Sequence, residues 1–79
     1  MIDRLVQVFA DTLRIDVTQV SDETSPENTP QWDSLATVRL AVAISEAFST
    51  KLSNAEVVAM RNFGLIRSML QSKGVVANG

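Results

Sequence analysis

The stretch TPQWDSLATVRL, residues 29–40, joins two kinds of sequence. The residues before it are acidic and rich in turn-forming types, whereas those after it are apolar and have the spacing of a helix. Asp33 stands at the junction, where its carboxylate can accept hydrogen bonds from the free N–H groups of a first helical turn. The sequence therefore predicts a helix over residues 34–49, with Asp33 as its N-cap and Ser34 in its first turn.

The predicted helix over residues 34–49 has apolar side chains on two faces. One stripe, suited to packing in a core, consists of Leu40, Ile44, Ala47 and Phe48. The other, which Arg39 and Glu46 flank, consists of Leu35, Val38 and Val42. A helix needs only one stripe to join a core, so we interpret the second as a docking surface for other proteins. The alternative is that both stripes are buried, in part beneath a loop, as in the central helix of a small bundle.

The residues before this helix predict one more helix and a long connection. Apolar residues at helical spacing predict an amphipathic helix over residues 2–15. The connection, residues 16–33, contains two prolines and many turn-forming residues without a helical period, so we expect a loop. Loops of this length are usually functional or mobile.

The residues after it predict two helices. A short helix is expected over residues 54–60, with Ser53 or Asn54 as its cap. A last helix over residues 63–72 follows Asn62, and Gly74 is a natural stop that leaves residues 74–79 as a frayed tail. The expected fold is a single all-α domain over residues 1–79. It is a small four-helix bundle with a long loop between its first two helices and a short third helix.

Composition narrows the possible functions. The 79-residue chain suits one small domain, and no apolar run approaches the ~20 residues that a bilayer-spanning helix needs. The N-terminus lacks the apolar core of a signal peptide. The absence of cysteine excludes disulfides and makes a cytoplasmic protein the default expectation. Neither a basic cluster nor an aromatic platform indicates nucleic-acid binding. Cysteine and histidine are absent, so the commonest metal ligands and the commonest general base are missing, and we expect no metal site.

Ser34 is the candidate functional residue, although a serine at a helix start usually has only a local role. A catalytic serine needs a base and an oxyanion hole, and this chain has no histidine and no G-x-S-x-G turn around Ser34. We therefore predict no enzymatic activity. A serine that another enzyme modifies needs only exposure, a rigid helix start and apolar neighbours. A helix N-terminus also suits an attached phosphate, so Ser34 is a candidate attachment point.

With these features the sequence resembles the acyl carrier proteins, whose Asp-Ser-Leu signature stands here as Asp33-Ser34-Leu35. The resemblance continues through DSLATVRLAVAISEAF, residues 33–48, and covers about residues 1–73. It implies that Ser34 carries 4′-phosphopantetheine, transferred from coenzyme A by a separate phosphopantetheinyl transferase. The arm's thiol would hold acyl groups as thioesters. The chain would then be a monomeric, non-catalytic phosphoprotein that receives acyl groups from loading enzymes and delivers them to acyl-transferring enzymes.

The resemblance also assigns a partner surface. Leu35, Val38 and Val42 match the family's apolar recognition positions, and Glu46 matches an acidic one. Arg39 stands where carriers of fatty-acid synthesis commonly have an acid. Ala36 and Ala47 also replace common acids, so attraction to basic partner surfaces should be weaker.

These departures favour a specialised pathway, such as a polyketide-like one, over housekeeping fatty-acid synthesis. Trp32 replaces a usually small residue, and we include it in the partner surface, with packing against the loop as the alternative. The segment DSLATVRL is also similar to carriers of D-alanine, so an aminoacyl cargo is one alternative function. An unmodified helical interaction module is the other.

Overall fold

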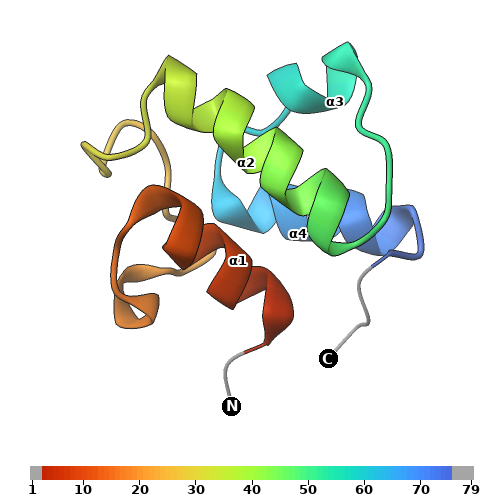
Figure 1. Cartoon of the computed structure of the whole chain (residues 1–79). Coiled ribbons are helices and arrows are strands. Elements are labelled where there is room, and N and C mark those ends of the chain that lie inside the picture. Colours follow the sequence, from red (N-terminus) through yellow and green to blue (C-terminus); the bar gives the residue numbers. More distant parts are fainter. Residues whose placement is uncertain (1–2, 76–79) are drawn as a thin grey trace.

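The computed structural model describes residues 3–75, and within this range all regular structure is helical (Figure 1). The elements in chain order are α1 (Arg4–Leu13), the short 3-10 helix η1 (Val17–Gln19), α2 (Ser34–Ala47), α3 (Asn54–Val58) and α4 (Phe63–Ser72). The all-α prediction is therefore confirmed. Two predicted features lie partly outside the described residues: the start of the first helix at residue 2, and residues 76–79 of the tail.

Side-chain caps define where the helices begin. Asp3 accepts a hydrogen bond from Val6 N at 2.9 Å, so α1 begins at residue 4. Of the two caps predicted for α3, Ser53 is the one used, and its side chain pairs with Glu56 in a capping box. Asn62 caps α4 as predicted, because its Oδ1 accepts from Leu65 N at 2.7 Å.

Three helices end earlier than predicted, whereas the last ends where expected. α1 stops before Arg14, which is left-handed at φ 59°, and α2 stops before Phe48, with Ser49 left-handed at φ 50°. α3 ends at Val58 rather than residue 60, because the chain turns there and buries Met60 in the core. α4 ends at Ser72 and is followed by Gly74 at φ 73°. Gly74 N donates to Gln71 O and Val75 N to Leu70 O, the pattern of a Schellman C-cap.

The core lies where α1, α2 and α4 meet. Figure 1 shows α1 and α2 side by side, with α4 passing behind α2 and with α3 above α2 at the upper right of the view. Phe9 of α1 contacts Phe63 of α4 edge-on, with ring centroids 4.8 Å apart. The buried apolar side chains of this core are Leu5, Phe9, Leu13, Trp32, Ala36, Leu40, Ile44, Met60, Phe63, Ile66 and Leu70.

The predicted loop over residues 16–33 is more ordered than its composition indicates. It contains η1, whose cap Asp16 accepts from Thr18 N, while the Gln19 side chain accepts from Asp16 N. Its middle part is fastened to the start of α4, because Phe63 N donates to Thr24 O at 2.8 Å and Gly64 N to Asp22 O at 3.0 Å. The loop thus satisfies two N–H groups that would otherwise lack acceptors in the first turn of α4.

Candidate functional site

Ser34 is the first residue of α2, and its side chain is exposed. Asp33 performs the capping, because its Oδ1 accepts from Ala36 N at 2.8 Å. The Asp33 carbonyl oxygen is also bonded, since Thr37 N donates to it at 3.0 Å and Thr37 Oγ1 at 3.2 Å. The Ser34 hydroxyl has no hydrogen-bond partner among residues 3–75. It is therefore a free primary alcohol at a position where the hydrogen bonds of Asp33 fix the backbone.

Trp32 is not part of an exposed surface. Only 1% of the residue is accessible, and its ring lies edge-on against Phe9 with centroids 5.2 Å apart and planes at 80°. Its Nε1 donates to Thr37 Oγ1 at 2.9 Å. The prediction that Trp32 contributes to a partner surface is therefore wrong, and the packing alternative is correct. A large aromatic ring that finds both an apolar neighbour and a partner for its N–H is stable in the interior.

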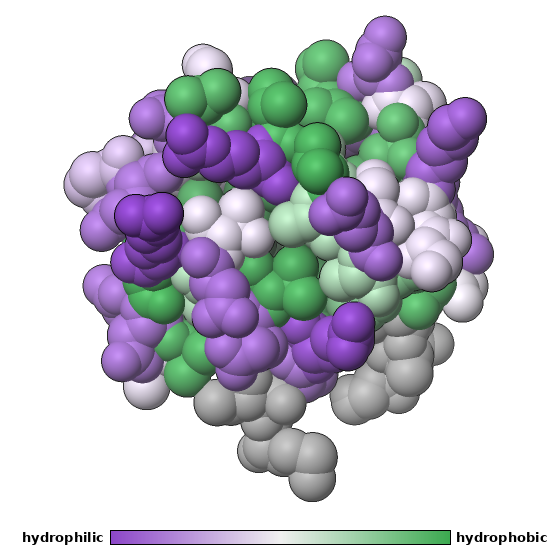
Figure 2. Space-filling view, in the orientation of Figure 1, coloured by the Kyte–Doolittle hydropathy of each residue, from purple (hydrophilic) through white to green (hydrophobic). Residues whose placement is uncertain are grey.

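The second apolar stripe of α2 is exposed. Leu35, Val38 and Val42 are 59%, 55% and 52% accessible, so no loop within residues 3–75 covers them. Arg39 and Glu46 are exposed as well. The alternative in which both stripes are buried is therefore wrong for this structure. Figure 2 shows apolar surface gathered along the upper edge of the molecule, over α2 and α3.

The buried stripe of α2 differs slightly from the predicted one. Leu40 and Ile44 are fully buried as expected, whereas Ala47 and Phe48 are only half-buried. Ala36 is buried too, although the predicted core stripe does not include it. The spacing of Ala36, Leu40 and Ile44 by four residues is the signal that places all three on one face.

Three carboxyl groups have lowered pKa values, and none of them belongs to α2. The Arg67 guanidinium, 2.7 Å from Asp3 Oδ2, lowers the pKa of Asp3. Lys73 Nζ, 2.9 Å from Glu56 Oε2, lowers the pKa of Glu56, and a hydrogen bond from Thr18 N lowers that of Asp16.

Arg39 and Glu46, in contrast, take part in no ion pair within the part of the chain that the structure describes. The charges beside the exposed stripe are therefore available to a partner. No group of three potential metal ligands occurs among residues 3–75. Within the same residues, no helix has the length and apolarity required to cross a bilayer.

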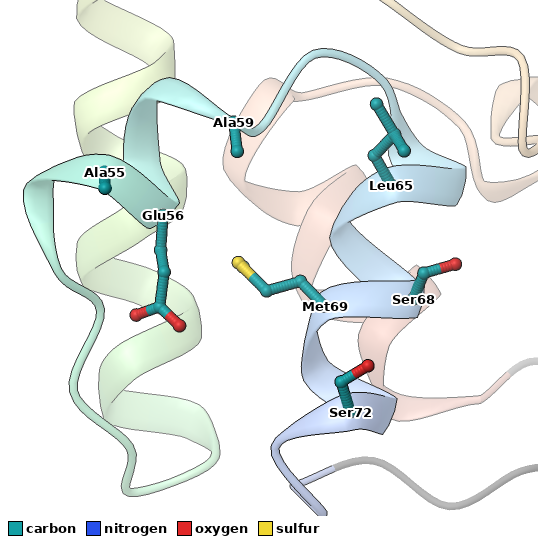
Figure 3. A pocket seen from close by; sticks show the side chains of 7 residues that line it. All are labelled: Ala55, Glu56, Ala59, Leu65, Ser68, Met69 and Ser72. Carbon is teal, nitrogen blue, oxygen red and sulfur yellow. The ribbon is translucent and has the colours of Figure 1, made fainter.

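A surface hollow of about 400 Å³, which no sequence pattern predicts, lies between α3 and α4. In Figure 3, Met69 reaches from α4 toward α3, and the Glu56 carboxylate lies at the side of the hollow. The lining is mainly apolar and consists of Ala55, Glu56, Ala59, Leu65, Ser68, Met69 and Ser72. Glu56 is already bonded to Lys73, so the hollow offers shape and apolar contact rather than a free charge.

A comparison of the chain with models of known protein families and with curated proteins found no match.

Proposed function

We propose that this protein is a carrier of the acyl-carrier type, a four-helix bundle that holds acyl groups as thioesters on a 4′-phosphopantetheine arm attached to Ser34. One observation carries the proposal. Ser34 presents an exposed hydroxyl without a hydrogen-bond partner among the described residues, at the start of a capped helix. It also directly precedes a stripe of exposed apolar side chains on the same helix. This combination suits a residue that other enzymes modify and approach repeatedly.

The local chemistry suits a phosphodiester. In the transfer, Ser34 Oγ gives its proton to a base of the transferase and bonds to the phosphorus that bears the pantetheine. The bond from this phosphorus to the oxygen that bridges the two phosphates breaks, and adenosine bisphosphate leaves. The transferase supplies the base, which this chain lacks. The first-turn N–H groups of Ser34 and Leu35 have no acceptor within the helix, and the positive end of the helix dipole favours the new phosphate charge. The chain thereby stabilises the product without catalysing its formation.

The exposed stripe supports delivery of the cargo to partner enzymes in the cytoplasm. Leu35, Val38 and Val42 supply apolar contact area, as the anchors of a helix in a groove do. Arg39 and Glu46 leave the surface with balanced charge, so partners with strongly basic docking sites gain little attraction. We therefore place the carrier in a specialised pathway, with an acyl cargo or, as the alternative, an aminoacyl one.

Intact-mass measurement tests the proposal. The folded protein is incubated with coenzyme A and a broad-specificity phosphopantetheinyl transferase, and we expect its mass to increase by one phosphopantetheine group. Ser34→Ala should abolish the increase. Ser68→Ala, which changes another exposed helical serine, should leave it intact. If several transferases fail on folded protein, the carrier proposal is wrong. The exposed stripe would then favour the alternative of an unmodified interaction module.

A further inference from the structure

We propose that Trp32 and Thr37 are positioning residues, which hold the backbone at Ser34 in the geometry required for transfer of the arm. The proposal rests on the proposed function of Ser34 and adds two residues that determine how well the site works. We call the Trp32 indole, the Thr37 hydroxyl and the Asp33 carbonyl the clasp. Trp32 and Thr37 act on Ser34 through the Asp33 carbonyl and not by contact with the reacting atoms.

The clasp is a short chain of hydrogen bonds that joins the residues on either side of Ser34. Trp32 Nε1 donates to Thr37 Oγ1 at 2.9 Å, and Thr37 Oγ1 donates to the Asp33 carbonyl oxygen at 3.2 Å. That oxygen belongs to the peptide group between Asp33 and Ser34, so the clasp fixes the orientation of the peptide plane that contains the Ser34 backbone N and Cα. A threonine hydroxyl in a helix often bonds the carbonyl four residues earlier. Here it also accepts the indole N–H and so ties the loop to the helix.

The core anchors the clasp. The Trp32 ring packs on Phe9 of α1, and Phe9 packs on Phe63 of α4, so displacement of the indole would disturb both helices. Trp32 N donates to Thr29 O at 2.9 Å, which fixes the turn that leads into the site. Trp32 and Ala36 are buried on either side of Ser34 in the sequence, whereas Ser34 itself is exposed. The Ser34 side chain is therefore held outward between two buried positions.

This arrangement should affect turnover more than binding. A transferase must align Ser34 Oγ with the phosphorus of coenzyme A, and a misplacement of about 1 Å can cost ~100-fold in rate. The exposed stripe formed by Leu35, Val38 and Val42 takes no part in the clasp. Breaking the clasp should therefore lower kcat for transfer of the arm by about tenfold or more, while KM for the protein changes little.

Paired substitutions separate the contributions of the Thr37 hydroxyl and the Trp32 indole N–H to the rate of transfer. Thr37→Val removes the hydroxyl with little change of shape, and Thr37→Ser restores it. Trp32→Phe keeps a buried aromatic ring and removes the N–H donor. Ile66→Val trims a fully buried side chain of α4 that forms none of the clasp hydrogen bonds, so it controls for lost core packing. Initial rates of transfer are measured by intact mass against protein concentration, at a temperature at which circular dichroism shows each variant folded.

We expect kcat for transfer of the arm to fall in Thr37→Val and Trp32→Phe and to return close to the wild-type value in Thr37→Ser. Ile66→Val should keep the wild-type kcat. Two outcomes would overturn it: a folded Thr37→Val or Trp32→Phe variant with wild-type kcat, or an equal fall in Ile66→Val. If Thr37→Val does not fold, Trp32→Phe decides the question by the same criteria.

Failure of the proposed function has a different signature. Wild-type protein that accepts no arm from any transferase refutes the carrier and, with it, the role of the clasp in transfer. Protein that accepts the arm equally well with and without the Thr37 hydroxyl refutes only the clasp. Hydrogen exchange of the Trp32 indole N–H, followed by NMR, provides a readout that needs no transferase. The N–H should be protected in the wild type and exchange faster in Thr37→Val, and equal exchange would contradict the clasp.

Discussion

Replacing Gly64 with alanine tests how firmly the loop over residues 16–33 is fastened to α4. A Cβ added at this position would lie 3.0 Å from the carbonyl oxygen of Asp22 and 3.1 Å from its Cβ. The backbone N of Gly64 also donates to that same oxygen at 3.0 Å. Only a residue without a side chain allows the loop and the helix to approach so closely. The substitution should therefore push the loop away from the start of α4.

Two opposing effects set the magnitude. Alanine favours a helix over glycine by about 1 kcal/mol. Against this, overpacking typically costs about 1–3 kcal/mol. The two hydrogen bonds from Phe63 N to Thr24 O and from Gly64 N to Asp22 O are weakened as well, at about 0.5–1.5 kcal/mol each. If both bonds are lost, these contributions add to a net loss of about 1–5 kcal/mol in the free energy of unfolding.

The loop has little freedom to relieve the clash. Thr24 is buried, and its hydroxyl accepts from Ser21 N at 2.9 Å and donates to Gln19 O at 3.1 Å. A shift of Asp22 would therefore strain a bonded turn on both sides. If the loop nevertheless moves freely, the helix-forming preference of alanine should dominate and the variant should be as stable as the wild type or more stable.

Urea unfolding followed by circular dichroism measures the difference in the free energy of unfolding between Gly64→Ala and the wild type. In thermal unfolding, each kcal/mol lost should lower the melting temperature by about 4–8 °C for a domain of this size. Ser68→Ala is the matched control, because it places alanine at an exposed position in the same helix and should change stability by no more than about 0.5 kcal/mol. A Gly64→Ala variant with wild-type or higher stability would refute the account of a tightly fastened loop.

Two further predictions concern the exposed stripe and the ion pair of α1. Val42→Asp should weaken transfer to partner enzymes, yet it should change the free energy of unfolding by no more than about 0.5 kcal/mol because Val42 is exposed. Leu40→Asp, at a fully buried position of the same helix, is the control and should unfold the protein. Equal loss of helical signal in both variants would show that the exposed stripe belongs to the core. Asp3→Asn keeps an N-cap residue but removes the charge that pairs with Arg67. Since Arg67 holds the pKa of Asp3 below its ordinary value of 3.8, the wild type should be the more stable protein above that pH and lose this small advantage as the pH falls through the lowered pKa. Urea unfolding across the acid range checks this, and an advantage that persists in strong acid would contradict it.

Much of the fold follows from interactions between neighbouring residues. The caps at Asp33 and Asn62 and the stop at Gly74 each depend on groups within a few positions along the chain, so the residue types alone predict them. The amphipathic period likewise predicts that the described part of the chain is helical. The Asp33-Ser34-Leu35 motif identifies Ser34 as the candidate site without any knowledge of packing.

Which apolar face of α2 is buried was decided only by the tertiary structure. Both faces are apolar enough for a core, and the choice depends on where α1 lies against the helix and on which face shares a core with α4. Trp32 illustrates the same point, because its burial needs Phe9, which lies far away in the sequence. The fastening of the loop through Asp22 and Thr24 also joins distant segments.

The sequence by itself therefore determined the approximate positions of the four α-helices, the caps of α2 and α4 and the position of Ser34, since these depend on local hydrogen bonds and on periodicity. The tertiary structure decided that Trp32 lies inside and that Leu35, Val38 and Val42 lie outside. Burial is a property of how distant segments pack, and an apolar side chain carries no local signal of which neighbour will cover it.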